Sequence, residues 1–356
     1  MRGLIFSTRD LCYYSASFFA DRIADSLEEK GESIVRADIP EDTDEGEIEE
    51  TLLKLSNERF DFILDFNSKL PRMKNEKGVP YLDTIMSVED DNVPAPFYNY
   101  ILDHPLYHHP GLSQKLKNYH VLVIDRYHGK YISDHYPDIK EVIYRPLPGS
   151  RALTEIPFEE RNDRLLFPGT YVARTLIEHE IERLYSEKKK RLIKDLFYEW
   201  DPEEKPMEDA VLERLTEEEK ELEPFTVLMN SLYPLDRLMR YERRRRLLFF
   251  LAENGIEIDI QGEGWEDTGI YGFSNVKRLP PSSIASSIEI MAGYKRILDV
   301  NPCFFEGLHD RVSSALENRC IVFSDMSEKT APDDENLRLY SFHKLENLLD
   351  GIRSDI

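Results

Sequence analysis

The stretch NPCFFEGLHDRVSSALENRCIVFSD, residues 301–325, contains a helix-forming segment that is followed by an apolar segment. Another apolar segment, KRILDV, precedes the stretch and ends at Val300, and CIVFSD closes it at Asp325. A strand, a loop, a helix and a second strand in this order form the repeating unit of a parallel α/β sheet. The loop and the start of the predicted helix concentrate polar side chains, namely Glu306, His309, Asp310 and Arg311.

The start of this helix is a candidate anion site. Val312, Ala315 and Leu316 have the spacing i, i+3, i+4, which predicts that this face of the helix packs on the sheet. The amide groups and the dipole at a helix N-terminus attract anions, and Arg311 could grip phosphate oxygens there. A purely structural alternative fits the same pattern: Asp310 caps the helix and Arg311 pairs with a neighbouring acid.

The loop itself has groups suited to a sugar phosphate. Gly307 lets the backbone approach a ligand closely. Glu306 offers acceptor atoms for sugar hydroxyls, and His309 could donate a hydrogen bond to a phosphate or a hydroxyl. Ligands of doubly wound sheets bind at the carboxyl ends of the strands, which is where this loop would lie.

Strand and helix patterns alternate along the chain in two successive halves. The first half has six predicted strands: RGLIFS (2–7), SIVRAD (33–38), FDFILDFN (60–67), PFYNYILDHP (96–105), HVLVIDR (120–126) and EVIYRPLP (141–148). The second half has five: RLLFPGTY (164–171), a half-buried strand in GIEIDIQGEGW (255–265), NVKRLPP (275–281), KRILDV (295–300) and CIVFSD (320–325). We therefore predict an α/β protein with two Rossmann-like, doubly wound domains, 1–155 and 156–356, and a helical insertion at about 172–245 in the second.

Composition excludes several classes of protein. The 356 residues carry a formal net charge of −23, which argues against nucleic acid as a partner. Three cysteines without a CxxC spacing indicate a reducing compartment rather than a disulfide framework. No apolar run is long enough to span a bilayer, and MRGLIFSTRD becomes charged too early for a secretory signal. We expect a soluble cytoplasmic protein.

The stretch at 301–325 resembles the C-terminal signature of CgeB-like (spore maturation type) glycosyltransferases of the GT-B fold. The matching residues are Asn301, Pro302, Gly307, His309, Arg311 and Asp325. Weaker similarities cover IDIQGEGW, RLLFPGTY and PFYNYILDHPLYH. The resemblance implies two Rossmann-like domains facing across a cleft, and a metal-independent hexosyltransferase that moves a sugar from a nucleotide-diphosphate sugar to an acceptor hydroxyl. It implies no cofactor besides this co-substrate.

The resemblance also implies roles for individual residues. The N-terminal domain would bind the acceptor, which is a glycan, a protein or a small molecule, and the C-terminal domain would bind the donor. The implied catalytic residues are Asp103, His104, Glu306 and His309. The resemblance implies that Gly307, Asp310, Arg311 and Ser314 bind the donor. Gly169, Thr170, Gly262 and Trp265 are further candidates because they follow predicted strands, and Arg278 is one by analogy with the fold. Lys295 could reach a phosphate or be an ordinary surface lysine.

One departure from the related Glu-x7-Glu pattern affects the function. The pattern would start at Glu306, and its second acid usually binds the nucleotide ribose, but this chain has Ser314 at that position. Two alternatives therefore stay open. The protein could be a non-catalytic relative that binds a nucleotide sugar or a partner, or it could be a nucleotide-sugar epimerase of GT-B-like fold.

Other polar residues have competing interpretations. Asp103 with His104 could deprotonate the acceptor, His104, His108 and His109 could bind a metal, and all could be ordinary turn residues. Ser7, Thr8, Asp10 and Asn67 also follow predicted strands. For the run RRRR at 243–246 we expect pairing with the surrounding acidic helices.

Overall fold

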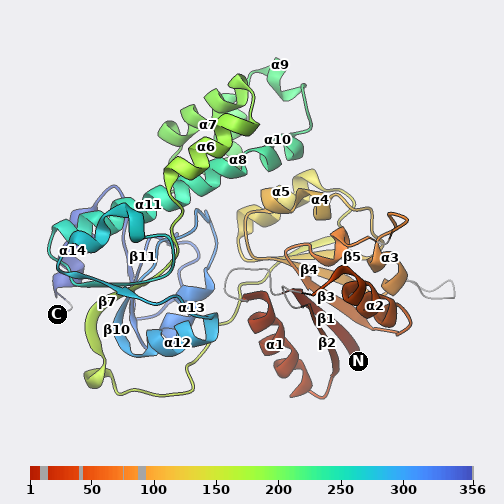
Figure 1. The fold of residues 1–356 in the computed structure, drawn as a ribbon, viewed down its shortest axis with the longest axis horizontal. Coiled ribbons are helices and arrows are strands. Elements are labelled where there is room, and N and C mark those ends of the chain that lie inside the picture. Colours follow the sequence, from red (N-terminus) through yellow and green to blue (C-terminus); the bar gives the residue numbers. More distant parts are fainter. Residues whose placement is uncertain (9–14, 40–42, 75, 87–93, 355–356) are drawn as a thin grey trace. The chain divides into compact units, whose positions relative to one another are not determined.

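The computed structural model describes residues 1–8, 15–39, 43–74, 76–86 and 94–354. The chain divides into two compact units, Met1–Arg145 and Pro146–Ile356, whereas the predicted boundary lay at 155. Each unit contains a six-stranded sheet in which every strand pairs in parallel with its neighbours (Figure 1). The predicted α/β class with two doubly wound halves is therefore confirmed.

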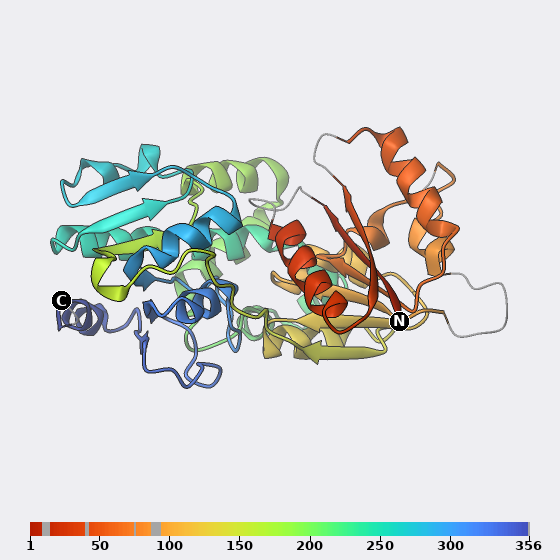
Figure 2. The same cartoon turned by 90° about the horizontal axis from the view of Figure 1, so that it is seen from below.

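The first unit has the strand order β2-β1-β3-β4-β5-β6. Its strands are β1 (Arg2–Thr8), β2 (Ser33–Ile39), β3 (Phe62–Phe66), β4 (Phe97–Ile101), β5 (Tyr119–Val123) and β6 (Glu141–Tyr144). Its helices are α1 (Ser15–Glu28), α2 (Glu45–Ser56), α3 (Tyr81–Met86), α4 (His109–Leu112) and α5 (Arg126–His135), with 3-10 turns η2 (Leu70–Arg72) and η3 (Pro105–His108). Helix α1 packs along β1 and β2 (Figure 2).

The second unit has the strand order β12-β11-β10-β7-β8-β9. Its strands are β7 (Asn162–Pro168), β8 (Ile258–Gln261), β9 (Val276–Leu279), β10 (Tyr294–Leu298), β11 (Ile321–Ser324) and β12 (Leu337–Leu339). Its helices are α6 (Arg174–Leu184), α7 (Glu187–Glu199), α8 (Met207–Arg214), α9 (Glu217–Lys220), α10 (Phe225–Ser231), α11 (Tyr233–Glu253), α12 (Ile284–Ala292), α13 (Asp310–Glu317) and α14 (Leu345–Ser354), with 3-10 turns η4 (Phe158–Glu160), η5 (Glu266–Thr268) and η6 (Ile270–Gly272).

Alternation of side chains along the strands gives the second sheet an apolar core on each face. Leu165 and Phe167 of β7 face a cluster that includes Leu247 and Leu251 of α11 and also residues of α14. Leu166, between them, faces α12 and α13 on the opposite side (Figure 1). Strand β8, predicted to be half-buried, is buried along its whole length because both faces of this sheet are covered.

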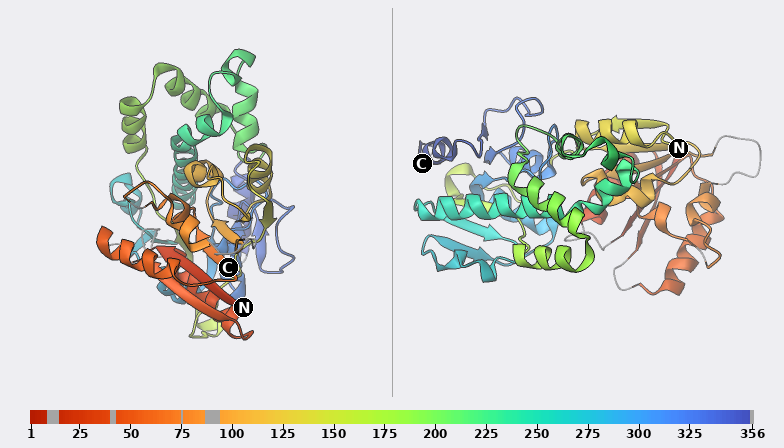
Figure 3. Two further views of the ribbon diagram at one scale, coloured as in Figure 1. Left: turned by 90° about the vertical axis from the view of Figure 1, so that its right-hand side faces the viewer. Right: turned by 90° about the horizontal axis from the view of Figure 1, so that it is seen from above.

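The predicted helical insertion consists of α6 to α10 and leads into α11. These helices lie on the far side of α11 from the strands of the second unit (Figures 1 and 3). Helix α11 contacts α6, α7 and α10, while Leu247, Leu248 and Leu251 near its end are fully buried in the sheet core. Helix α11 therefore connects the insertion to the sheet. Within the described residues, no helix has the length and apolar character needed to cross a membrane.

The segment after β8 packs tightly against the segment after β7. Trp265 is fully buried, and its indole Nε1 donates a hydrogen bond to the Gly169 carbonyl at 2.8 Å. Gly264 has φ +85°, and a Cβ at this position would lie 1.9 Å from the Tyr171 carbonyl oxygen. Glycine is therefore required there both for its backbone conformation and for the close approach.

We predict that Gly264→Ala destabilises the second unit by about 3 kcal/mol or more, because it adds a clash to the cost of a left-handed alanine. Gly269→Ala is the matched control: Gly269 has φ +82° but open space around the Cβ position, so only about 1 kcal/mol is expected. Urea unfolding followed by tryptophan fluorescence measures this unit, since both tryptophans, Trp200 and Trp265, belong to it. Equal losses in the two variants would contradict the steric explanation.

Candidate functional site

The candidate site lies at the carboxyl ends of β10 and β11, where α13 begins. His309 caps α13, because its ring Nδ1 accepts a hydrogen bond from the Arg311 amide at 3.1 Å. The structural alternative had given this capping role to Asp310. Burial and the guanidinium groups of Arg311, Arg244 and Arg240 hold the pKa of His309 well below its ordinary value. The ring is therefore neutral, and its proton is on Nε2, where it can be donated to a ligand.

Arg311 is held by a buried carboxylate. Its guanidinium donates to Asp299 Oδ1 at 2.8 Å, and the other oxygen of Asp299 accepts from Ser324 Oγ at 2.7 Å. Tyr340 OH donates to the Asp299 carbonyl at 2.8 Å. Asp299 is completely buried. The expected pairing of Arg311 with a neighbouring acid is therefore present, and it gives the arginine a defined position at the start of α13.

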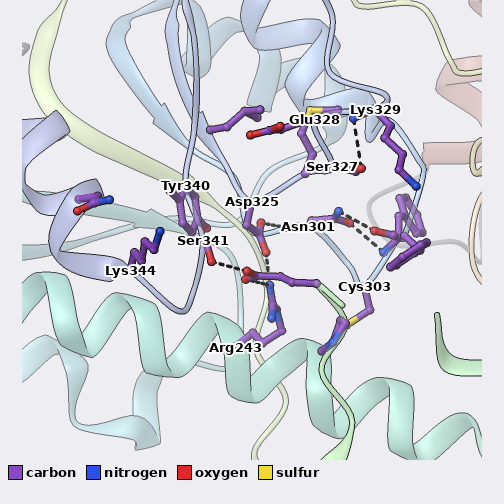
Figure 4. A pocket seen from close by; sticks show the side chains of 17 residues that line it. Arg243, Asn301, Cys303, Asp325, Ser327, Glu328, Lys329, Tyr340, Ser341 and Lys344 are labelled. Carbon is purple, nitrogen blue, oxygen red and sulfur yellow. Dashed lines mark hydrogen bonds and ion pairs between the residues drawn. The ribbon is translucent and has the colours of Figure 1, made fainter. Parts of the chain in front are cut away.

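The loop between β10 and α13 is fixed by Asn301 and Asp325. The Asn301 side chain accepts from the Phe304 amide at 3.0 Å and donates to the Phe304 carbonyl at 2.9 Å. The Asn301 amide donates to Asp325 Oδ1 at 2.6 Å. These contacts enclose Cys303, which has the left-handed φ of +62° that non-glycine residues rarely adopt. Figure 4 shows this loop beside a pocket of about 460 Å³.

Two consecutive arginines of α11 have opposite electrostatic surroundings. Arg243 forms ion pairs with Asp325 and, at 3.1 Å, with Glu203. Arg244 is only 6% exposed, and it donates to the Thr170 carbonyl at 2.8 Å. Among the residues that the structure describes, no carboxylate lies within ion-pair distance of Arg244. Burial and the charges of Arg311 and Arg240 lower the pKa of Arg244 to about 10.

The pairing expected for RRRR thus holds for Arg243, and for Arg245 with Glu242, but not for Arg244. The sequence contained a signal for this exception. Arg244 shares the spacing i, i+3, i+4, i+7 with the buried Leu247, Leu248 and Leu251, so it lies on the apolar face of α11. A cation on an apolar face needs a counter-charge from elsewhere.

Several predicted donor-binding residues have structural contacts instead. The Gly169 and Thr170 carbonyls accept from Trp265 and Arg244. Gly262 has φ +151° and a Cβ position 2.4 Å from the Gly169 carbonyl oxygen, so it serves the same packing as Trp265. The GEGW segment therefore holds the segment after β8 against the segment after β7. Its predicted donor contact through Trp265 does not fit, because this side chain is fully buried in the core.

Three further residues that were predicted to bind the donor form contacts within the protein. Lys295 lies at the amino end of β10, whereas α13 begins after the carboxyl end of this strand. Its side chain forms an ion pair with Asp163 at 2.6 Å. Arg278 is exposed on the edge strand β9 and pairs with Glu266. Ser314 is buried, and its Oγ accepts from the Ser150 amide at 3.1 Å, so this hydroxyl holds the segment that leads into β7.

The other loop residues remain at the candidate site. Glu306 pairs with Lys329 at 2.6 Å, and the Gly307 carbonyl accepts from Thr330 Oγ1 at 3.2 Å. Asp310 is half-buried beside His309, with its Oδ1 3.2 Å from the ring Nδ1. The structure thus brings together Glu306, Gly307, His309, Asp310 and Arg311, and it adds Arg244.

In the first unit, Asp103 and His104 point to different surroundings. His104 is buried and caps η3, since its Nδ1 accepts from the Leu106 amide at 3.1 Å. Asp103 is partly exposed, and Asn67 Nδ2 lies 3.4 Å from its Oδ2. The predicted partnership of Asp103 with His104 as a base is therefore replaced by one between Asp103 and Asn67.

The structure does not favour the alternative interpretation of His104, His108 and His109 as a metal site. His108 is buried, which lowers its pKa to about 4, and His109 hydrogen-bonds Tyr136 OH at 3.1 Å. Across the described residues, the one group with metal-ligand geometry is Asp201, Glu204 and His343, mostly exposed in the second unit.

The polar residues predicted to follow the first strand have mixed outcomes. Ser7 donates to Asp38 at 2.8 Å, Thr8 is buried, and Asp10 lies outside the described residues.

Comparison with known proteins shows the fold. No family model matches the chain, and no curated protein matches it significantly. A solved alpha-glucosyltransferase in complex with UDP matches with a TM-score of 0.55 and 11% identity over 99% of this chain and 90% of that chain. The same kind of enzyme with UDP-glucose and DNA containing an abasic site matches with a TM-score of 0.52, at the same identity and coverage. The predicted GT-B fold is thereby confirmed, while the CgeB-like subtype stays a prediction.

In β3 of the first unit, Asp65 is a buried acid. It accepts from the Leu70 amide at 2.9 Å through Oδ2, while Oδ1 has no hydrogen-bond partner among the described residues. Burial raises the pKa of Asp65 to about 7. Because the folded pKa is above the unfolded value of about 3.9, stability should fall as the pH rises from about 4 to 7 and then level off.

We predict that Asp65→Asn removes this pH dependence. The free energy of unfolding of the wild type should drop by about 1 to 3 kcal/mol more than that of the variant between pH 5 and pH 8. Chemical denaturation at several pH values, followed by far-ultraviolet circular dichroism, provides the measurement. Parallel pH profiles for the two proteins would show that Asp65 is ionised in the folded state at all of these pH values.

The two α11 arginines should respond in opposite directions to the same substitution. Arg244→Met removes a buried cation that has no carboxylate, so it should stabilise the protein by about 1 to 2 kcal/mol. Arg243→Met leaves Asp325 buried without its partner, so it should destabilise by about 3 kcal/mol. Thermal and urea unfolding decide between these signs. A destabilised Arg244→Met variant would mean that Arg244 is compensated within the protein.

Proposed function

We propose that the protein is a glycosyltransferase that uses a nucleotide-diphosphate sugar, with the donor bound at the α13 end of the second unit. The observation that carries this proposal is Arg244, a buried cation without a carboxylate, close to Arg311 and to the N-terminus of α13. A diphosphate would supply the missing negative charge. The cost of leaving a buried charge uncompensated gives such a site a strong preference for an anion.

The same groups fit the chemistry of sugar transfer. When the bond between the anomeric carbon and the diphosphate breaks, negative charge develops on the leaving oxygen. Two guanidinium groups and the positive end of the α13 dipole would stabilise this charge. Neutral His309 would donate from Nε2 to a phosphate or sugar oxygen, and Glu306 would accept from sugar hydroxyls.

We infer that the reaction proceeds without a metal ion. In many phosphoryl and sugar-phosphate sites a cation neutralises the leaving group. Here Arg244 and Arg311 would take this role, and no other cofactor is needed. The acceptor would bind at the carboxyl edge of the first sheet, where Asp103 is partly exposed.

Two solved structures of alpha-glucosyltransferase support the choice of donor class, since these complexes contain UDP or UDP-glucose. A hexosyl donor with a uridine base is thus the first to test. A second candidate function follows from Ser314, because its hydroxyl is used by Ser150 and the position has no acid. Such a protein would bind a nucleotide sugar without transferring it.

The test is a panel of nucleotide sugars assayed for binding by calorimetry and for release of free nucleotide. We expect turnover of at least one donor, and unchanged turnover in EDTA. Arg311→Ala and Arg244→Met should each weaken nucleoside-diphosphate binding about 10-fold to 100-fold, because each removes a charge-assisted contact. Lys295→Ala is the control, since Lys295 lies at the opposite edge of the sheet and should leave binding unchanged.

Each outcome separates the two functions. Tight nucleotide-sugar binding without release of nucleotide would establish the non-catalytic alternative. Full activity of Arg311→Ala would remove the proposed donor site. Retained nucleoside-diphosphate binding in Arg244→Met would show that Arg244 does not bind the diphosphate.

A further inference from the structure

The turn that follows β3 is strained in an unusual way. Asn67 and Ser68 have φ values of +52° and +56°, so two consecutive non-glycine residues adopt the left-handed conformation. This conformation is costly for residues with a side chain, and glycine would adopt it without cost. Strain of this kind persists only where the surroundings impose it, and it concentrates at functional sites.

The surroundings of the turn are built to impose this conformation. Asn99, buried in the middle of β4, accepts from the Ser68 amide at 2.9 Å and donates to Ser68 Oγ at 2.7 Å and to Tyr119 OH at 2.8 Å. From the other side, Arg72 donates to the Ser68 carbonyl at 2.8 Å and to the Asn67 carbonyl at 3.1 Å. The backbone of both strained residues is therefore held through side chains.

The strained turn gives the Asn67 side chain one direction. Asn67 is 2% exposed, and its Oδ1 accepts from the Leu102 amide at 2.8 Å. Because the Leu102 amide can only donate, the carboxamide oxygen must face it, and the amino group must face the other way. There Nδ2 lies 3.4 Å from Asp103 Oδ2. One side chain thus contacts both the backbone before Asp103 and the carboxylate of Asp103.

We propose that Asn67 is the positioning residue for Asp103, and that Asp103 is the base that deprotonates the acceptor. This inference rests on the proposed function. The hydroxyl proton of the acceptor moves to the Asp103 carboxylate, and the acceptor oxygen forms a bond to the anomeric carbon. The bond from that carbon to the diphosphate breaks, and its electron pair leaves on the diphosphate. Water replaces the acceptor in donor hydrolysis.

The test compares variants of the full chain with UDP-glucose as the probe and water as the acceptor. Asn67→Gly keeps the backbone conformation without strain but removes the carboxamide. We expect its kcat for hydrolysis to fall about 10-fold to 100-fold, because a misplaced catalytic group costs rates of this order. Its KM for UDP-glucose should not change, since the donor site belongs to the second unit.

Two further variants separate positioning from folding. Asn118→Gly is the matched control, because Asn118 also has a left-handed φ, of +54°, but precedes β5 at the other edge of the sheet; its kcat should equal that of the wild type. Asn67→Asp tolerates the same backbone conformation and still accepts from the Leu102 amide, but places a second carboxylate beside Asp103. We expect it to be as slow as Asn67→Gly or slower. Wild-type kcat in Asn67→Asp would overturn the proposal.

A structural measurement keeps the inference testable if UDP-glucose is not hydrolysed. Crystal structures of the wild type and of Asn67→Gly should show the Asp103 side chain in different rotamers, and an unchanged rotamer would overturn the positioning role. Absence of hydrolysis in the wild type would count against UDP-glucose as the donor, which is a failure of the proposed function and not of this contact. Asp103→Asn should abolish hydrolysis wherever the wild type is active.

Discussion

The structure of the second unit depends on the pairing of buried arginines with buried carboxylates at the carboxyl ends of its strands. Arg311 and Arg243 each lie against a buried carboxylate, Asp299 and Asp325, that directly follows a central strand. These pairs are arranged so that removing either partner would leave a charge without compensation. Arg244 shares this environment without a carboxylate of its own. Among the described residues, Arg244 therefore stays an excess positive charge, and this is the observation on which the proposed anionic ligand rests.

Much of the fold could be predicted from local patterns. Short apolar segments such as those around Phe6 and Ile63 became parallel strands of the first sheet, as predicted. The short edge strand β12 was not predicted, because Leu337–Leu339 has too few apolar residues to give a periodic signal. The burial of β8 on both faces was also missed, since alternation alone cannot reveal that Asp259 finds a buried partner in Arg164.

The candidate site was predictable in outline but not in its partners. The motif at 301–311 located the helix N-terminus and the loop, because both are local features. Which residues complete the site depends on contacts between distant segments. Arg244 of α11 donates to the Thr170 carbonyl after β7, whereas the sequence suggested that it pairs with an acidic helix. Ser314 accepts from the Ser150 amide, whereas the sequence suggested that it contacts the donor. Lys295 was misplaced because a residue's position at the start or the end of a strand decides which edge of the sheet it serves.

Both units use an asparagine side chain to hold a loop that follows a parallel strand. In each, a loop follows a parallel strand, contains a left-handed non-glycine residue and is fixed by an asparagine that donates and accepts at once. Asn301 binds both backbone groups of Phe304, and Asn99 accepts from the Ser68 amide and donates to Ser68 Oγ. Because these contacts are made within each unit, the geometry of each loop does not depend on the other unit. Under the proposed function, the affinity for a diphosphate would depend on the second unit and the reactivity of an acceptor on the first, so a substitution in either loop should affect one of these quantities without the other.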